Sequence, residues 1–116
     1  MSNNGRYILV DRRPVPEPIL LKWARWLETA DRVVAQDTVR EACGDGVAGV
    51  EVSTVFLGLD QIFRNEGAPV LFETKVFGGI MDGERERYST WAEAEAGHQR
   101  MLERVRAAVN EVEVDE

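Results

Sequence analysis

The chain has 116 residues, of which 44% are hydrophobic and 30% are charged, a composition typical of a single folded domain and not of a disordered chain. Its formal charge is −7, and because four of the acids lie among the last six residues, the rest of the chain has a formal charge of −3. Because the rest of the chain is also acidic, its surface is not uniformly basic, and we expect neither general nucleic-acid binding nor binding to anionic membranes. A local basic patch is still possible.

The N-terminal part predicts a strand, a stiff connection and a helix. Tyr7 to Val10 is a short apolar run, and the prolines at 14, 16 and 18 forbid regular hydrogen bonding after it. We expect a helix to start near Pro18, because proline is tolerated in the first turn. Its apolar residues fall on one broad side that faces the core or its rim, and Leu21 is the exposed exception. That side contains Ile19, Leu20, Trp23, Ala24, Trp26, Leu27 and Ala30.

The middle of the chain predicts a hairpin and a central strand. Arg32 to Val39 is typical of a strand, and the glycine-rich link Glu41 to Gly49 indicates a hairpin loop. Val50 to Leu57 has apolar side chains on both faces, as expected of a central strand that is partly covered on each side. Asp60 to Pro69 is expected to be a loop.

Two further strands are expected after that loop. Val70 to Phe77 alternates, so Glu73 and Lys75 should face solvent or a partner. Asp82-Gly83 is a turn signal, and Arg85 to Tyr88 suits an edge strand whose alternating charges resist pairing with another molecule.

The segment from Thr90 to Val109 predicts a capped amphipathic helix. Thr90 and Glu93 have the spacing of a capping box, in which each side chain satisfies a backbone donor. The only histidine, His98, lies in the middle of the apolar stripe. The stripe contains Trp91, Ala94, His98, Met101, Leu102, Val105, Ala108 and Val109.

Together these elements predict one α+β domain over residues 1–110. We expect an antiparallel sheet of about four to five strands with two amphipathic helices packed on it, in the order β-α-β-β-β-α. The acidic segment 111–116 is expected to be a frayed tail.

Cysteine usage and the N-terminus favour a cytoplasmic protein. Cys43 is the only cysteine, so no intramolecular disulfide can form. The first residues, MSNNGRYILVDRR, lack a basic segment followed by a long apolar core, and no apolar run approaches the roughly 20 residues needed to span a bilayer. We therefore expect neither a signal peptide nor a membrane span.

His98 is the one weak catalytic candidate. An imidazole titrates near neutral pH, so His98 with a nearby carboxylate could serve as a general base, although packing in the stripe explains it better. One cysteine and one histidine cannot supply four nitrogen or sulfur ligands, which excludes a structural zinc. A thiolate pair of Cys43 with His98 is disfavoured, because Glu41 and Asp45 lie beside the thiol. We expect no metal and no cofactor.

Carboxylates and glycines have ordinary explanations. The glycine clusters lack the strand-to-helix context and the lysine of phosphate-binding loops, so turn geometry accounts for them. Glu51 and Glu73 could approach one another if their strands are adjacent, and Asp60 and Asp82 are further candidates for acid–base or metal work. Solvated charge on a sheet face, with Lys75 as a neutralising partner, is the simpler interpretation.

Three tryptophans are either core residues or part of a binding surface. An aromatic ring beside Arg25, Arg87 or Lys75 could stack a nucleobase or anchor a protein partner. The candidate residues for ligand or partner binding are Trp23, Arg25, Trp26, Glu73, Lys75, Arg87, Trp91 and His98.

The runs VEVSTVFLGLD, PVLFETKVFGG and RYSTWAEAEAGH together resemble small bacteriophage- and prophage-encoded proteins to which no activity is attached. The resemblance covers Val50 to about His98 and the helical segment Leu21 to Trp26. It implies a compact acidic protein made inside an infected bacterium, outside the core virion machinery. Such proteins often act by binding, for example as inhibitors of a host enzyme or of a host defence system.

We therefore expect a non-enzymatic accessory protein that binds a host protein or a small nucleotide-like ligand. The exposed sheet face and the loops 60–69 and 78–87 are the expected binding surfaces. Two alternatives stay open. One is a small hydrolase or transferase that uses His98, and the other is a homodimeric structural protein joined by an edge strand or by the tryptophan-bearing helix.

Overall fold

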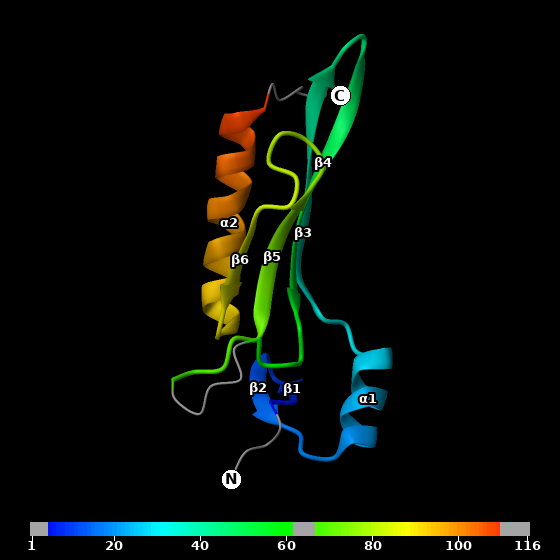
Figure 1. The fold of residues 1–116 in the computed structure, drawn as a ribbon, viewed down its shortest axis with the longest axis vertical. Coiled ribbons are helices and arrows are strands. Elements are labelled where there is room, and N and C mark those ends of the chain that lie inside the picture. Colours follow the sequence, from blue (N-terminus) through cyan, green and yellow to red (C-terminus); the bar gives the residue numbers. More distant parts are fainter. Residues whose placement is uncertain (1–4, 62–66, 110–116) are drawn as a thin grey trace.

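The computed structural model describes residues 5–61 and 67–109 and confirms an α+β fold. Figure 1 shows a sheet with a long helix along it and a smaller unit at one end. In chain order the elements are β1 (Tyr7–Val10), β2 (Arg13–Pro16), α1 (Leu20–Thr29), β3 (Val33–Cys43), β4 (Gly46–Phe56), β5 (Phe72–Phe77), β6 (Arg85–Tyr88) and α2 (Trp91–Ala108).

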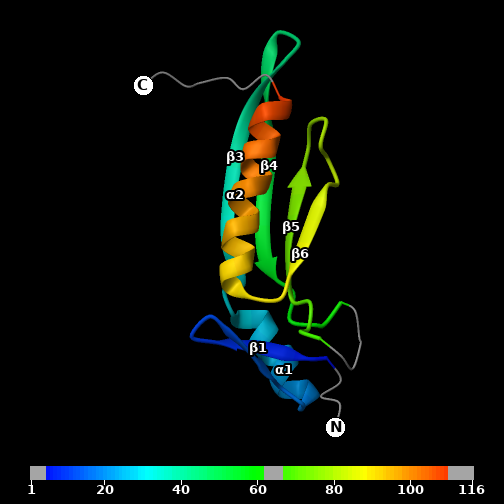
Figure 2. The same ribbon diagram turned by 90° about the vertical axis from the view of Figure 1, so that its left-hand side faces the viewer.

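The main sheet is an antiparallel meander in the order β3-β4-β5-β6. Helix α2 lies along one face of it, as Figures 1 and 2 show. Alternate residues of β4 and β5 are buried under α2, because successive side chains of a strand point to opposite faces. These buried residues are Val50, Val52, Thr54 and Phe56 on β4, and Phe72, Thr74 and Val76 on β5.

The opposite face of the sheet, here called the open face, has no described element packed over it in Figure 1. The side chains that alternate with the buried ones point to this face, and they are half-buried or exposed. On the two central strands they are Glu51, Ser53 and Val55 of β4, and Glu73, Lys75 and Phe77 of β5. The predicted outward direction of Glu73 and Lys75 is confirmed.

Strands β1 and β2 form a separate two-stranded hairpin, which corrects the expectation of a stiff connection after Val10. Pro14 and Pro16 occupy alternate positions opposite Leu9 and Tyr7, so both missing N–H groups fall on the outer edge of β2. Asp11 and Arg12 form the turn, with φ of 51° and 65°. Two successive positive φ values match the twist of a hairpin, but neither residue is the glycine that usually signals this turn.

Helix α1 lies beside the hairpin at the end of the molecule and not on the main sheet. This corrects the expectation of two helices packed on one sheet. None of its residues is buried, and Ile19 and Leu20, which were expected to face the core, are 49% and 55% exposed. Leu21 is exposed as predicted, whereas Trp23 and Trp26 lie at the rim of the core.

The link between β3 and β4 is shorter than expected. Both strands continue through most of the segment 41–49, and only Gly44 and Asp45 stand between Cys43 and Gly46.

Strand β4 is central in the sheet as predicted, and β6 is an edge strand as predicted. The tail 111–116 and part of the loop 60–69 lie outside the described residues.

Helix α2 confirms the capped amphipathic helix. Thr90 Oγ1 accepts from the Glu93 N–H at 3.1 Å, and Glu93 Oε1 accepts from the Thr90 N–H at 3.1 Å, which completes the capping box. Ala108 differs from the predicted stripe, because it is exposed. The residues of α2 that are buried against the sheet are Ala94, Gly97, His98, Met101, Leu102 and Val105.

Candidate functional site

His98 is fully buried between α2 and the sheet, and both nitrogens of its ring have partners. Nδ1 is 2.7 Å from Thr54 Oγ1 on β4, and Nε2 is 2.7 Å from Asp37 Oδ2 on the edge strand β3. The side chain of Asp37 is 44% exposed, so the carboxylate contacts both the ring and solvent. A buried polar ring needs such partners, because an unpaired nitrogen would forfeit its hydrogen bond to water.

From His98 the hydrogen bonds continue across the sheet. The hydroxyls of Thr54 and Thr74 are hydrogen-bonded to each other between β4 and β5, where the two residues are direct register partners. The Tyr88 hydroxyl of β6 donates to Thr74 Oγ1 at 3.1 Å. We call this series the buried polar chain. It is formed by Asp37, His98, Thr54, Thr74 and Tyr88, and it connects all four strands with α2.

Tyr88 is held at the end of the buried polar chain by a close approach to α2. Its ring lies against Gly97, where the Cβ of any other residue would collide with the phenol. Burial raises the pKa of Tyr88 above its ordinary value of 10.0, the hydrogen bond to Thr74 lowers it, and the nearby Glu86 carboxylate raises it again. The net direction is upward, so the fold favours the neutral phenol.

The order Asp37–His98–Thr54 matches that of a catalytic triad, but the burial of the hydroxyl opposes catalysis. A nucleophile must be reachable by the substrate and hydrogen-bonded mainly to its base. Thr54 and His98 are each 0% exposed, and the Thr54 hydroxyl is also bonded to Thr74. The geometry therefore favours a structural role for the sole imidazole, as the apolar stripe suggests.

The other candidate acid–base and thiol groups are not brought together. Cys43 is exposed beside the turn of the β3–β4 hairpin, while the ring nitrogens of His98 are bonded to other residues. Glu51 is opposite Phe77 and Glu73 is opposite Val55, so the two carboxylates are not cross-strand partners.

Asp60 and Asp82 instead accept backbone N–H groups, from Val70 at 3.0 Å and from Gly78 at 2.7 Å. Within residues 5–61 and 67–109, no group of three histidine, cysteine or acidic side chains is placed to hold a metal ion.

Two aromatic rings lie beside cations, of which Lys75 was a candidate from the sequence and Arg12 was not. The guanidinium of Arg12 lies 5.0 Å from the centre of the Trp91 ring, and Lys75 Nζ lies 5.4 Å from the centre of Phe77. Trp23 instead donates its ring N–H to the Gly58 carbonyl at 2.9 Å. The ring of Trp26 packs edge-on against Phe56, with the two centres 5.7 Å apart.

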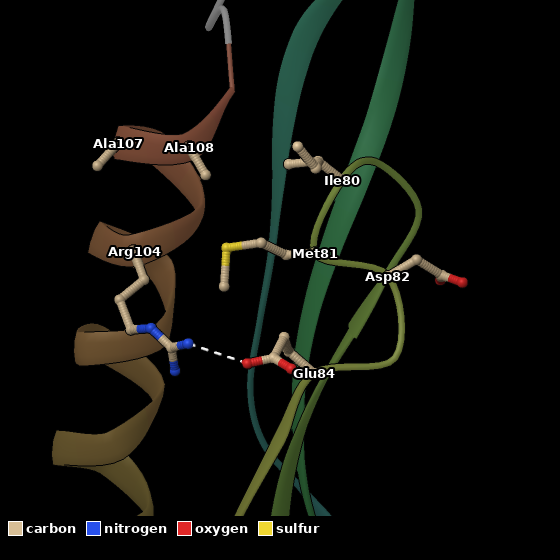
Figure 3. A pocket seen from close by; sticks show the side chains of 7 residues that line it. All are labelled: Ile80, Met81, Asp82, Glu84, Arg104, Ala107 and Ala108. Atoms are coloured by element: carbon tan, nitrogen blue, oxygen red, sulfur yellow. Dashed lines mark hydrogen bonds and ion pairs between the residues drawn. The ribbon is translucent and has the colours of Figure 1, made fainter.

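A shallow groove of about 530 Å³ lies between the end of α2 and the connection from β5 to β6. Figure 3 shows Arg104 of α2 paired with Glu84 across it, at 3.0 Å. The loop 78–87 was a predicted binding surface, whereas the participation of α2 was not predicted. The lining residues are Ile80, Met81, Asp82, Glu84, Arg104, Ala107 and Ala108.

Large exposed apolar side chains are concentrated in one N-terminal segment of the sequence. Of nine such residues in the described part of the chain, six belong to the segment 10–33, and we call these six the N-terminal apolar group. Sequence reasoning identified only Leu21 as exposed, because helical periodicity shows which side is apolar but not what covers it. The group consists of Val10, Val15, Ile19, Leu20, Leu21 and Val33.

Comparison with protein-family models, with curated proteins and with solved structures finds no match to this chain. Among the described residues, no helix is long and apolar enough to cross a membrane.

Proposed function

We propose that this chain is a non-enzymatic, phage-type accessory protein that docks on a protein of the bacterial host. The observation that carries the proposal is the N-terminal apolar group, whose most exposed member, Leu21, is 68% exposed. Single exposed apolar residues are normal on a protein surface, but three consecutive ones, Ile19 to Leu21, stand exposed at the start of α1 and offer an interaction surface.

The surroundings of the N-terminal apolar group suit a protein partner. Trp23 and Trp26 are half-buried on the same helix, and exposed charges of both signs, such as Lys22 and Glu28, accompany them. Aromatic anchors within a polar rim are typical of protein interfaces. Complete burial of a leucine side chain is worth about 1.5–3 kcal/mol, so Leu20 and Leu21 can anchor a complex.

The interior supports binding over catalysis. Both nitrogens of the only histidine are used to hold α2 on the sheet, through bonds to Thr54 and Asp37. We therefore expect His98→Gln to lower the unfolding free energy, and we do not expect it to abolish a catalytic activity. Inhibition of a host defence system is one role that docking alone can perform.

The test starts with capture of host proteins on the immobilised chain, followed by calorimetric titration of the purified captured protein. We expect Leu20→Ser combined with Leu21→Ser to raise the Kd at least about tenfold, which corresponds to about 1.4 kcal/mol. Val47→Ser is the matched control, because Val47 is 56% exposed at the other end of β4. The proposal fails if no protein binds in stoichiometric amount, or if all variants bind equally well.

Two other functions have specific tests. The groove beside Arg104 falls in the volume range of small-ligand sites, which supports binding of a nucleotide-like molecule as a second candidate. A nucleotide at 100 times its Kd should stabilise the chain by about 2.7 kcal/mol, an effect measurable as a shift in Tm. Light scattering over a concentration series tests whether the N-terminal apolar group instead joins two copies of this chain.

A further inference from the structure

The charge on the open face differs in sign from that of the whole chain. The register places four cationic side chains and two carboxylates on this face, whereas the formal charge of the protein is −7. The cations are Arg40, Lys75, Arg85 and Arg87, and the acids are Glu51 and Glu73.

Lys75 and Arg85 are direct register partners across β5 and β6. The Cβ atoms of such pairs lie roughly 4.5–5.5 Å apart, and like charges in this position repel. Within residues 5–61 and 67–109, neither side chain takes part in an ion pair. Among the described residues, the repulsion is therefore left without an acid that neutralises it.

The acids on the open face already have partners. Glu73 Oε2 is 2.9 Å from Arg87 Nε, and the carboxylate of Glu51 accepts from the side-chain amide of Gln36. Ser53 lies directly opposite Lys75 on β4, so it adds a small hydroxyl and no charge beside the cation. The pair Lys75–Arg85 is thus the part of this face that most lacks a negative charge.

We propose that the open face binds an acidic segment of the partner protein, with Asp or Glu carboxylates placed between Lys75 and Arg85. Phe77 is 45% exposed next to this pair and offers an apolar contact. A single-stranded nucleic acid fits less well, because open sheets that bind it stack bases on several aromatic rings. Phe77 is the one aromatic side chain on the described open face, and Glu51 and Glu73 would oppose a continuous row of phosphates.

This inference rests on the proposed function, since it names the chemistry of the partner. Its test uses an octaglutamate peptide as the probe, titrated into the full chain at about 50 mM salt, where charge screening is weak. Changes in the amide NMR signals should map to β5 and β6 and should disappear at high salt. The same titration with octathymidylate tests the nucleic-acid alternative.

Two double variants with equal net charge locate the site. Lys75→Gln combined with Arg85→Gln should raise the Kd for octaglutamate about three- to tenfold. Arg13→Gln combined with Arg106→Gln removes two exposed cations of β2 and α2, which lie off the open face, and should change the Kd less than about twofold. Arg85→Gln alone replaces the first double variant if that variant does not fold, and it should still weaken binding.

Three results would overturn the inference. The first is that the amide NMR signals do not change, or change outside β5 and β6. The second is that the two double variants weaken octaglutamate binding equally. The third is that octathymidylate binds the open face at a lower concentration than octaglutamate. If octaglutamate does not bind the open face while binding of a captured host protein still depends on Leu20 and Leu21, this inference is wrong and the proposed function stands. If no host protein binds, the proposed function fails, whatever the peptide does.

Discussion

Replacement of Thr54 by Val tests the buried polar chain with the smallest change in shape. Valine has nearly the same volume as threonine, but it removes the hydroxyl that contacts His98 Nδ1 at 2.7 Å and also contacts Thr74. Thr74 keeps the bond from Tyr88, whereas the His98 nitrogen loses its partner at a fully buried position. An unsatisfied buried polar group costs about 1–3 kcal/mol, so we expect a loss of about 2–3 kcal/mol in unfolding free energy.

Urea and thermal unfolding give the measurement. For a chain of this size the loss corresponds to a fall in Tm of roughly 8–12 °C. Thr38→Val makes the same chemical change at an exposed position on β3, and it should alter stability by less than about 0.5 kcal/mol. A Thr54→Val protein as stable as the Thr38→Val control would refute the structural role of the chain.

Three further predictions concern Tyr88, Gly97 and Thr90. Tyr88→Phe should be less stable by about 0.5–1.5 kcal/mol at pH 7. That difference should shrink above pH 10 in urea titrations, because a raised phenol pKa gives stability that is present below the unfolded pKa and lost as the pH rises through the folded pKa. Gly97→Ala should destabilise by about 1–3 kcal/mol despite better helix propensity, since its Cβ collides with the Tyr88 ring, and Tyr88→Leu in the same chain should relieve the loss in thermal melts. Thr90→Ala should lower the unfolding free energy by about 1 kcal/mol by removing the capping box, and unchanged stability would contradict that role.

Periodicity predicted the elements whose residues alternate between core and solvent. The buried positions Phe72, Thr74 and Val76 of β5, and most of the apolar stripe of α2, follow directly from the spacing of apolar residues. Strand β2 was missed because its prolines oppose regular pairing, and because its turn uses positive φ at Asp11 and Arg12 without a glycine. Sequence rules for proline do not show which edge of a strand lacks a pairing partner, so they could not place Pro14 and Pro16 with their missing N–H groups on the outer edge of β2.

The partners of the candidate groups depend on contacts between distant parts of the chain. His98 bonds to Thr54 and Asp37, which precede it by 44 and 61 residues. The alternation within one strand does not fix its register against the next, so neither these partners nor the opposition of Lys75 and Arg85 followed from the sequence. The exposure of Ile19 and Leu20 was likewise hidden, because an apolar helix side looks the same whether its own domain or a partner covers it.

Hydrogen exchange of the chain, alone and in complex with the captured host protein, tests the docking claim most directly. We expect slower exchange over the β1–β2 hairpin and the first turn of α1, where all members of the N-terminal apolar group except Val33 lie. Protection confined to the outer surface of α2, with residues 10–33 unchanged, would contradict it.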